Sequence, residues 1–202
     1  MGLWYGEPPS VGGPRGPDLV DRELVERAQR GDRDAYEALA RASAAPLYRT
    51  AYRIVRDTDR ADDAVQQTLV AMWRELPSLR DPDRFDGWTY RLVVRFCLLE
   101  SRRARRTGVR EISLDELTPA RSDAYADADL RDQLDRALAA LSPDHRAVVV
   151  MHHYDGLPLG EIADILGVPY GTVGSRLHHA TRSLRAAIAA DDRSPISGGQ
   201  PA

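Results

Sequence analysis

Residues 157–188 read LPLGEIADILGVPYGTVGSRLHHATRSLRAAI, which is two amphipathic patterns separated by a break. The break falls at 167–169, where Pro169 lacks a backbone donor and disfavours helix at the residue before it. Ahead of the break, Ile162, Ala163 and Leu166 share one face of a short helix. Two helices joined by a tight, glycine-containing turn predict a helix-turn-helix. After the break, apolar residues recur at the spacing of one helical face: Val173, Leu177, Ala180, Leu184 and Ile188.

The second of these helices has a polar face that carries no acidic residue. Its side chains are Thr172, Ser175, Arg176, His179 and Arg182. An α-helix fits the major groove of DNA, where hydroxyl and cationic side chains contact base edges and phosphates. This face therefore predicts DNA binding through the second helix.

The composition is that of a globular chain. It has 202 residues, 43% hydrophobic and 29% charged. No apolar run reaches the roughly 20 residues of a membrane span, and the Gly- and Pro-rich start does not resemble a secretory signal. We therefore expect a cytoplasmic protein. The single cysteine, Cys97, excludes an internal disulfide and a cysteine zinc cluster. The net charge of −3 conceals charges that are segregated along the chain.

Helical periodicity extends over a first domain at residues 18–106, with tails at 1–17 and 191–202 that we expect to be disordered. Asp18 and Asp34 are expected to cap the first two helices, and Pro46 to begin a third. One long helix is expected at 61–76 with Trp73 in its apolar stripe. A loop at 77–87 and a last helix at 88–106 follow.

Residues 107–128 lack periodicity and are rich in acids, which predicts a flexible acidic linker. The second domain is expected at 129–190. Its first helix carries Leu134 and Leu141, and its second begins at Ser142-Pro143, a preferred helix start, and runs to about Tyr154. The helix-turn-helix completes this domain. The predicted fold is all-α, with two small helical domains joined by the linker.

Two blocks of sequence resemble a known family. The first is RADDAVQQTLVAMW at 60–73, followed by FDGWTYRLV at 85–93. The second is ALSPDHRAVVVMHHYDGLPLGEIADILGVPYGTVGSRLHHATRSLR at 140–185. In this order and separation they are similar to the bacterial extracytoplasmic-function sigma factors of the sigma-70 family. The resemblance covers about residues 18–190.

The resemblance implies a dissociable subunit that directs core RNA polymerase to promoters. The implied partners are promoter DNA and two parts of the core: the clamp helices of its largest subunit and the flap of its second largest. No cofactor, catalytic group or membrane insertion is implied. The long helix would dock the clamp helices, because acids and amides offer acceptors to arginine-rich helices. The implied docking residues are Asp62, Asp63, Gln66 and Gln67. An ordinary solvated helix face is the alternative interpretation.

Residues 77–87 and the helix after them correspond to the reader of the −10 promoter element. Strand opening requires stacking faces for unstacked bases and cations for the backbone. Tyr90 is the expected exposed aromatic, whereas Phe85 and Trp88 could stack on bases or pack in the core. The implied cations are Arg80, Arg84, Arg91, Arg95, Arg102, Arg103, Arg105 and Arg106.

The helix-turn-helix would read the −35 element. The implied contacts are Tyr170, Gly171, Thr172, Ser175, Arg176, His179 and Arg182. The chain departs from the family at Gly174, His179 and Thr181, where basic residues are usual, so we expect weaker phosphate contacts. Gly174 also costs about 1 kcal/mol of helix stability relative to alanine.

One alternative function is consistent with the same helix-turn-helix. A one-component regulator that binds an operator without polymerase would use the same helix-turn-helix, with residues 18–106 as a sensor.

The family resemblance further implies an anti-sigma factor that covers Asp62–Met72, and a linker that threads an active-site channel. The histidine pairs at 152–153 and 178–179 do not suit a metal, because adjacent helical residues point about 100° apart. Cys97, in an apolar helix, predicts a buried inert thiol.

Overall fold

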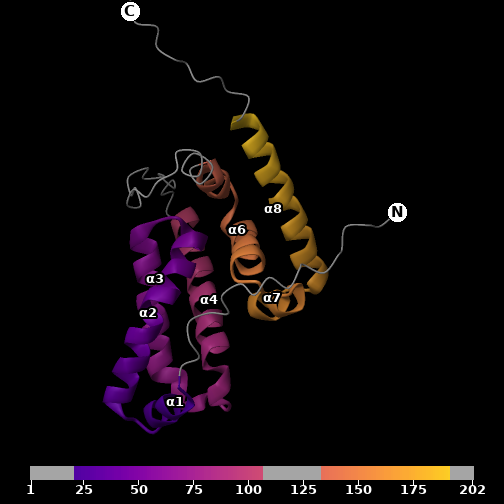
Figure 1. Ribbon diagram of the computed structural model, residues 1–202. Helices are drawn as coiled ribbons and strands as arrows, with labels where there is room; N and C mark the ends of the chain where they lie inside the picture. Colours follow the sequence, from indigo (N-terminus) through magenta and orange to yellow (C-terminus); the bar gives the residue numbers. More distant parts are fainter. Residues whose placement is uncertain (1–20, 107–132, 192–202) are drawn as a thin grey trace, which may run out of the picture.

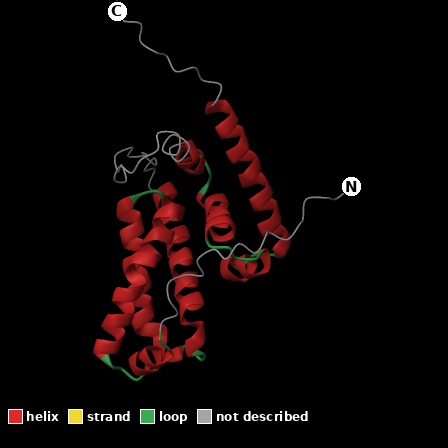
Figure 2. Cartoon of the chain, viewed as in Figure 1, coloured by secondary structure: helices red, strands yellow, loops and turns green. Residues whose placement is uncertain are grey.

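The computed structural model describes residues 21–106 and 133–191, which form helices and turns with no strand among them (Figures 1 and 2). The predicted tails, the linker and the Asp18 cap lie outside the described residues. The first half contains α1 (Arg22–Gln29), α2 (Arg33–Val55), α3 (Thr58–Glu75), the 3-10 turns η1 (Leu76–Ser78) and η2 (Pro82–Arg84), and α4 (Phe85–Arg106). The second half contains a helix at 133–139, α6 (Pro143–Val149), the π turn η3 (Val150–Tyr154), α7 (Leu159–Leu166) and α8 (Tyr170–Asp191). The all-α prediction is confirmed.

One long helix, α2, replaces the two helices that were expected around Pro46. The prediction was wrong because Pro46 lies inside α2 rather than at a helix start. An internal proline costs about 3 kcal/mol through its lost hydrogen bond and its ring. Burial along both sides of the proline offsets this cost, since α2 places Leu39, Leu47, Ala51 and Ile54 in the core.

Aspartates cap the helix starts, although not always the aspartates expected. Asp32, rather than Asp34, caps α2 by accepting from the Ala35 N–H at 3.1 Å. Asp57 caps α3, which therefore begins at Thr58, earlier than expected. A side-chain acceptor at this position satisfies a backbone donor that has no partner within the helix.

The loop before α4 is shorter than expected because the helix begins at Phe85. Phe85 is only 2% exposed and anchors the first turn of α4 in the core. The interpretation of Phe85 as a stacking face for DNA bases is thus wrong, and its ring packs in the core instead. Cys97, further along α4, is buried as expected, and burial raises the pKa of its thiol to about 12.

The helix-turn-helix is confirmed. Gly167 ends α7 in the left-handed conformation (φ +62°), which glycine adopts without a steric cost. The Thr172 N–H donates to the Pro169 carbonyl at 2.9 Å as α8 begins. Val173 and Ala180 on the predicted stripe are completely buried. None of the described helices is long and apolar enough to cross a membrane.

The two halves share a continuous hydrophobic core. Val150, Met151 and Ile162 of the second half belong to the same buried cluster as Ile54 and Val93 of the first. α6 packs against α2 and α4, and α7 packs against α4. α8 packs on α6 and α7 and forms the outer edge of the second half (Figure 1). A sequence read as two domains joined by a linker did not predict this contact.

Candidate nucleic-acid and polymerase interface

The outer face of α3 carries the predicted polymerase-docking residues. Asp62, Asp63 and Gln66 are exposed. Gln67 is half-buried, and its amide donates to Glu100 of α4 at 2.7 Å. This hydrogen bond ties Gln67 to α4 and leaves the other three side chains as the open acceptors of the face.

Two apolar side chains extend the same face, and sequence reasoning did not assign either to it. Val70 is 45% exposed and Trp73 is 46% exposed, so the expectation that Trp73 points inward was wrong. The edge of Tyr36 meets the Trp73 ring with centroids 4.7 Å apart, and the Tyr36 hydroxyl donates to the Leu69 carbonyl. The contact with Tyr36 therefore holds the Trp73 ring in place while part of it stays exposed. The signal in the sequence was the spacing 62, 66, 70, 73, which places these residues on one helical face.

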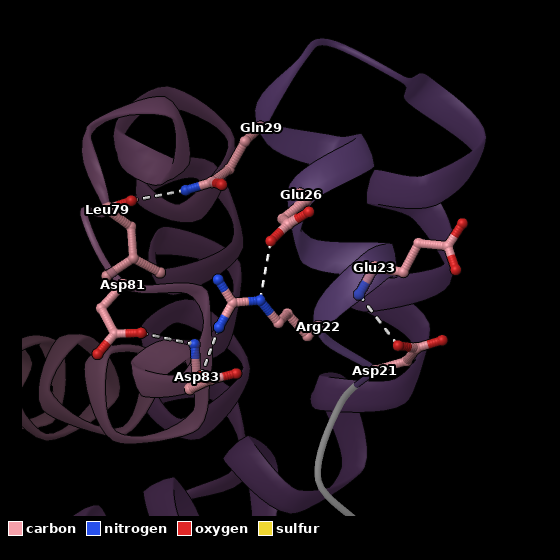
Figure 3. A network of polar contacts seen from close by, with 8 residues as sticks. All are labelled: Asp21, Arg22, Glu23, Glu26, Gln29, Leu79, Asp81 and Asp83. Carbon is pink, nitrogen blue, oxygen red and sulfur yellow. Dashed lines mark hydrogen bonds and ion pairs between the residues drawn. The ribbon is translucent and has the colours of Figure 1, made fainter.

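The loop between α3 and α4 is fastened to α1 by a polar network (Figure 3). Gln29 donates to the Leu79 carbonyl at 2.7 Å, and Arg22 reaches Asp83 at 2.6 Å and Glu26 at 2.9 Å. Asp81 accepts from the Asp83 N–H and lies 3.4 Å from the Arg84 guanidinium. These contacts hold the loop in one conformation, from which the predicted −10 cations Arg80 and Arg84 project into solvent.

A stripe of arginines follows one face of α4. The stripe consists of Arg91, Arg95, Arg102 and Arg106, at spacings of four, seven and four residues, and all four are exposed. At 1.5 Å per residue it extends over about 22 Å. A row of cations of this length can follow several phosphates of a single strand. Arg105 is also exposed, and Arg103 is paired with the buried Glu100 at 3.1 Å.

Tyr90 does not have the exposure expected of it. Its ring is half-buried and its hydroxyl donates to Asp155, which lies just after η3 in the second half. Burial, followed by the nearby Asp155 charge, raises the pKa of Tyr90 well above its ordinary value. The prediction of an exposed aromatic at this position is therefore wrong for the chain in this arrangement. Trp88 is half-buried and packs against the core, with its ring 6.2 Å from that of Phe85.

The predicted −35 residues lie together along the first four turns of α8. Tyr170 is 61% exposed, and Gly171, Ser175, His179 and Arg182 are also exposed. Thr172 is half-buried, and its carbonyl accepts from the Ser175 hydroxyl at 2.9 Å. With Gly174 and Leu159, three of these residues line a shallow hollow where α7 meets α8: Tyr170, Gly171 and Ser175.

Residues of α6 modify this face in a way the sequence did not indicate. Asp144 lies 3.5 Å from the Arg176 guanidinium, and both side chains are half-buried. His145 stacks on His179 with ring centroids 6.4 Å apart. Burial, then the positive charge of Arg176, lowers the pKa of His145, which favours the neutral ring. The face thus offers fewer cations than its arginine and histidine content suggests.

Gly174 offers a direct test of whether the fold requires a glycine at the hollow. A Cβ added there would meet nothing within 4 Å, so the fold itself does not require glycine. We expect Gly174→Ala to raise the free energy of unfolding by about 0.5–1 kcal/mol, because alanine is the better helix former. Urea denaturation measures this gain, and a loss of stability instead would mean that the glycine relieves a clash. Gly171→Ala, one turn earlier in the same hollow, is the matched comparison.

No group of three or more metal-ligating side chains occurs within residues 21–106 and 133–191. The rings of His152 and His153 meet edge to face with centroids 4.8 Å apart. His152 Nδ1 lies 3.0 Å from the Leu157 carbonyl. Both histidine pairs therefore make ring contacts within the fold.

Family models match both halves of the chain. Sigma-70 region 2 matches residues 39–107, and Sigma-70, region 4, matches residues 131–184. The ECF RNA polymerase sigma factor SigL of Mycobacterium tuberculosis is 36% identical over 154 residues, which is 73% of this chain and 85% of SigL. The ECF RNA polymerase sigma factor SigE of Mycolicibacterium smegmatis is 34% identical over 156 residues, or 75% of this chain, and the match spans 60% of SigE.

Solved structures give the same result for the fold. CnrH, in complex with the cytosolic domain of CnrY, matches with a TM-score of 0.58 and 27% identity over 85% of this chain and 98% of CnrH. The sigma factor RpoE of Bartonella quintana, in complex with the anti-sigma factor NepR, matches with a TM-score of 0.55 and 25% identity. That match covers 72% of this chain and 91% of RpoE.

Proposed function

Because this chain belongs to the extracytoplasmic-function RNA polymerase sigma factors of the sigma-70 family, we propose that α3 docks core polymerase, α4 binds the −10 element and α8 reads the −35 element. Catalysis belongs to the polymerase, and this chain supplies promoter choice and help with strand opening. The single observation that carries the proposal is that all three surfaces are present in one chain, each on a different helix.

Docking on core polymerase is supported by the chemistry of α3. Asp62, Asp63 and Gln66 supply acceptors, and Val70 and Trp73 supply apolar area on the same face. A protein interface commonly combines an apolar centre that includes an aromatic with a polar rim. The clamp helices of the largest subunit, with their arginines, are the proposed partner of this face. The flap of the second largest subunit is the proposed partner of the second half.

Promoter opening is supported by the arginine stripe of α4 and by the fastened loop before it. Arg91, Arg95, Arg102 and Arg106 would follow the backbone of one separated strand, and Arg80 and Arg84 would contact phosphates near the loop. Cations that contact phosphates position DNA without reading its sequence. Base selection at the −10 element would then depend on Tyr90, once its hydroxyl is released from the contact with Asp155.

The −35 element is assigned to α8. In this proposal Thr172, Ser175 and Arg176 would read base edges, and the residues around them would contact the DNA beside them: Tyr170, Gly171, His179 and Arg182. With few free cations on this face, α8 would bind duplex DNA weakly without polymerase. A one-component regulator must bind its operator tightly alone, and the α3 face would have no purpose in it.

The decisive experiment is in vitro transcription with purified core polymerase and a library of promoter fragments. We expect the purified chain to bind core polymerase and to direct initiation at a defined set of promoters. No core binding and no directed initiation would overturn the proposal. Tight, specific gel shifts with the chain alone would favour the one-component regulator instead.

Arg176→Ala tests the division of labour between the halves. We expect initiation at promoters that depend on the −35 element to fall about tenfold or more, since one base-reading contact contributes about 1–3 kcal/mol. Core binding should not change, because Arg176 is on α8, whereas the proposed docking face is on α3. Arg185→Ala, an exposed arginine further along α8, is the matched control. Equal loss of core binding and initiation would contradict the separation of roles.

We also propose an anti-sigma partner, because CnrH and RpoE match this fold and RpoE was solved with an anti-sigma factor. Its proposed site is the α3 face around Asp62–Met72, where it would compete with polymerase. We expect the chain to act in the cytoplasm, where polymerase and DNA are found.

A further inference from the structure

The first turn of α6 contacts two of the predicted −35 residues on α8. Asp144 Oδ1 lies 3.5 Å from Arg176 Nη2. Beside this ion pair, the His145 ring stacks on the His179 ring with centroids 6.4 Å apart. Arg176 and His179 are three residues apart and so share one face of α8. α6 therefore packs beside the part of α8 that we propose reads the −35 element.

The backbone that carries Asp144 is held in place on both sides. Pro143 is buried at the start of α6, and the Ser142 hydroxyl oxygen accepts from the His145 N–H at 3.4 Å. Two residues after Asp144, the Arg146 side chain is completely buried. Its guanidinium donates to four backbone carbonyls at 2.7–3.1 Å: those of Ile54, Leu138, Ala139 and Leu141. Asp144 thus projects from a fixed turn, between a buried proline and a buried arginine.

The Arg176 side chain is also restricted. It is 25% exposed and the Asp144 side chain is 29% exposed, so both are partly enclosed where α6 meets α8. An arginine side chain in open water samples many rotamers, and fixing one of them when DNA binds costs conformational entropy. A carboxylate on a fixed turn removes part of that freedom before DNA arrives. The pair therefore suits Arg176 to contact DNA in one orientation.

A guanidinium can contact a carboxylate and a base at the same time. It carries five N–H donors in one rigid plane. Each Nη nitrogen has two protons, so a contact between Nη2 and Asp144 leaves a second edge with two parallel donors. Guanine presents two acceptors in the major groove, O6 and N7, and a bidentate arginine is the most common specific contact with them. The geometry is therefore suited to the recognition of guanine by Arg176.

Stability alone does not account for the ion pair. Pairs that water can reach contribute little to stability, because water and salt screen them. Asp144 also places a negative charge beside a surface that is proposed to face phosphates, and this weakens DNA binding in general. A residue that lowers affinity for every sequence is explained if it improves discrimination between sequences.

We propose that Asp144 is a positioning residue for −35 recognition, which holds the Arg176 guanidinium in the orientation that reads guanine at one position of the element. Asp144 acts through Arg176 and does not contact the base itself. The inference rests on the proposed function, in which α8 reads the −35 element. The stack of His145 on His179 supports it, because this second contact joins the same two helices beside the ion pair.

Transcription by core polymerase and the full chain, from a promoter library with a randomised −35 element, tests the proposal. Arg176→Ala identifies the position at which the wild-type preference for guanine disappears. Asp144→Ala should lower the guanine preference at that same position by about fivefold or more and leave the other positions unchanged. Initiation averaged over the library should be unchanged or higher, because the variant removes a negative charge beside the DNA.

Three further variants distinguish positioning from folding. Asp144→Asn keeps the size of the side chain and one acceptor oxygen, so it should keep more of the guanine preference than Asp144→Ala. The double variant Asp144→Ala/Arg176→Ala should lose no more than Arg176→Ala alone, because no guanidinium is left to position. Asp164→Ala removes an exposed acid from α7 and is the matched control, which should keep every preference. Circular dichroism checks that the variants fold.

The outcomes separate this inference from the proposed function. If Asp144→Ala lowers initiation by the same factor at every −35 sequence, Asp144 only stabilises α6 and the inference fails. It also fails if Asp144→Ala keeps the guanine preference that Arg176→Ala removes, and the proposed function then stands. A preference for another base at that position would overturn the assignment to guanine. A wild-type chain with no −35 preference would overturn the −35 role of α8 in the proposed function, and the positioning role with it.

Discussion

Replacing both Asp62 and Asp63 with arginine is expected to weaken core polymerase binding by about 100-fold, which is about 2.7 kcal/mol. The two carboxylates are exposed near the start of α3 and face the proposed arginine-rich clamp helices. Reversal replaces two attractions with two repulsions, and each exposed pair contributes up to about 1 kcal/mol. The loss should be largest at low salt, because ions screen exposed charges.

Titration of labelled core polymerase with the variant measures this loss. The matched control is Glu23→Arg/Glu37→Arg, which makes the same charge change at exposed positions on α1 and α2. The control should bind within a few-fold of the wild type. If both double variants lose affinity equally, net charge rather than the α3 face governs docking, and the assignment of that face fails.

Replacing Arg146 with methionine is expected to destabilise the fold by about 3–5 kcal/mol. Methionine keeps much of the stem but removes the guanidinium donors of the Ile54, Ala139 and Leu141 carbonyls. The Leu138 carbonyl also loses the Arg146 donor but still accepts from the Leu141 N–H at 3.1 Å. Buried acceptors left without partners cost about 1–3 kcal/mol each when water cannot reach them, and partial relaxation reduces the sum.

Urea unfolding followed by circular dichroism checks this value, with Arg182→Met on the exposed face of α8 as the control. The control should change stability by less than about 0.5 kcal/mol. Arg146→Lys should fall between the two, because one ammonium cannot reach carbonyls that a planar guanidinium reaches together. A loss below about 1 kcal/mol for Arg146→Met would mean that water replaces the guanidinium.

Local sequence signals were sufficient for most elements. The stripe from Val173 to Ile188 and the break at Pro169 predicted the helix-turn-helix, because helical spacing and proline sterics act over a few residues. The same reasoning failed at Pro46, where burial on both sides of the proline outweighs its local cost. It also failed at Trp73, because the spacing of apolar residues on a helix does not show which of them are covered by neighbouring helices.

The candidate surfaces also combine features that local sequence predicts with features that depend on tertiary contacts. Residue type and spacing were enough to identify the acceptors on α3 and the polar face of α8. The arginines of α4 were each recognised in the sequence, and their alignment along one face depends only on the extent of the helix. The occupation of Tyr90 by Asp155, and of Arg176 by Asp144, could not be predicted, because each contact joins residues that lie far apart in the chain.

By itself, the sequence determined that this protein is helical, that it carries a helix-turn-helix and that it belongs to the extracytoplasmic-function sigma factors. These properties depend on local periodicity and on motifs that are read along the chain. Only the tertiary structure decided that Arg146 is buried between two helix ends, that Trp73 is exposed and that the two halves close on each other. Such features depend on which distant segments pack together and exclude water, and the local spacing of residues does not determine this.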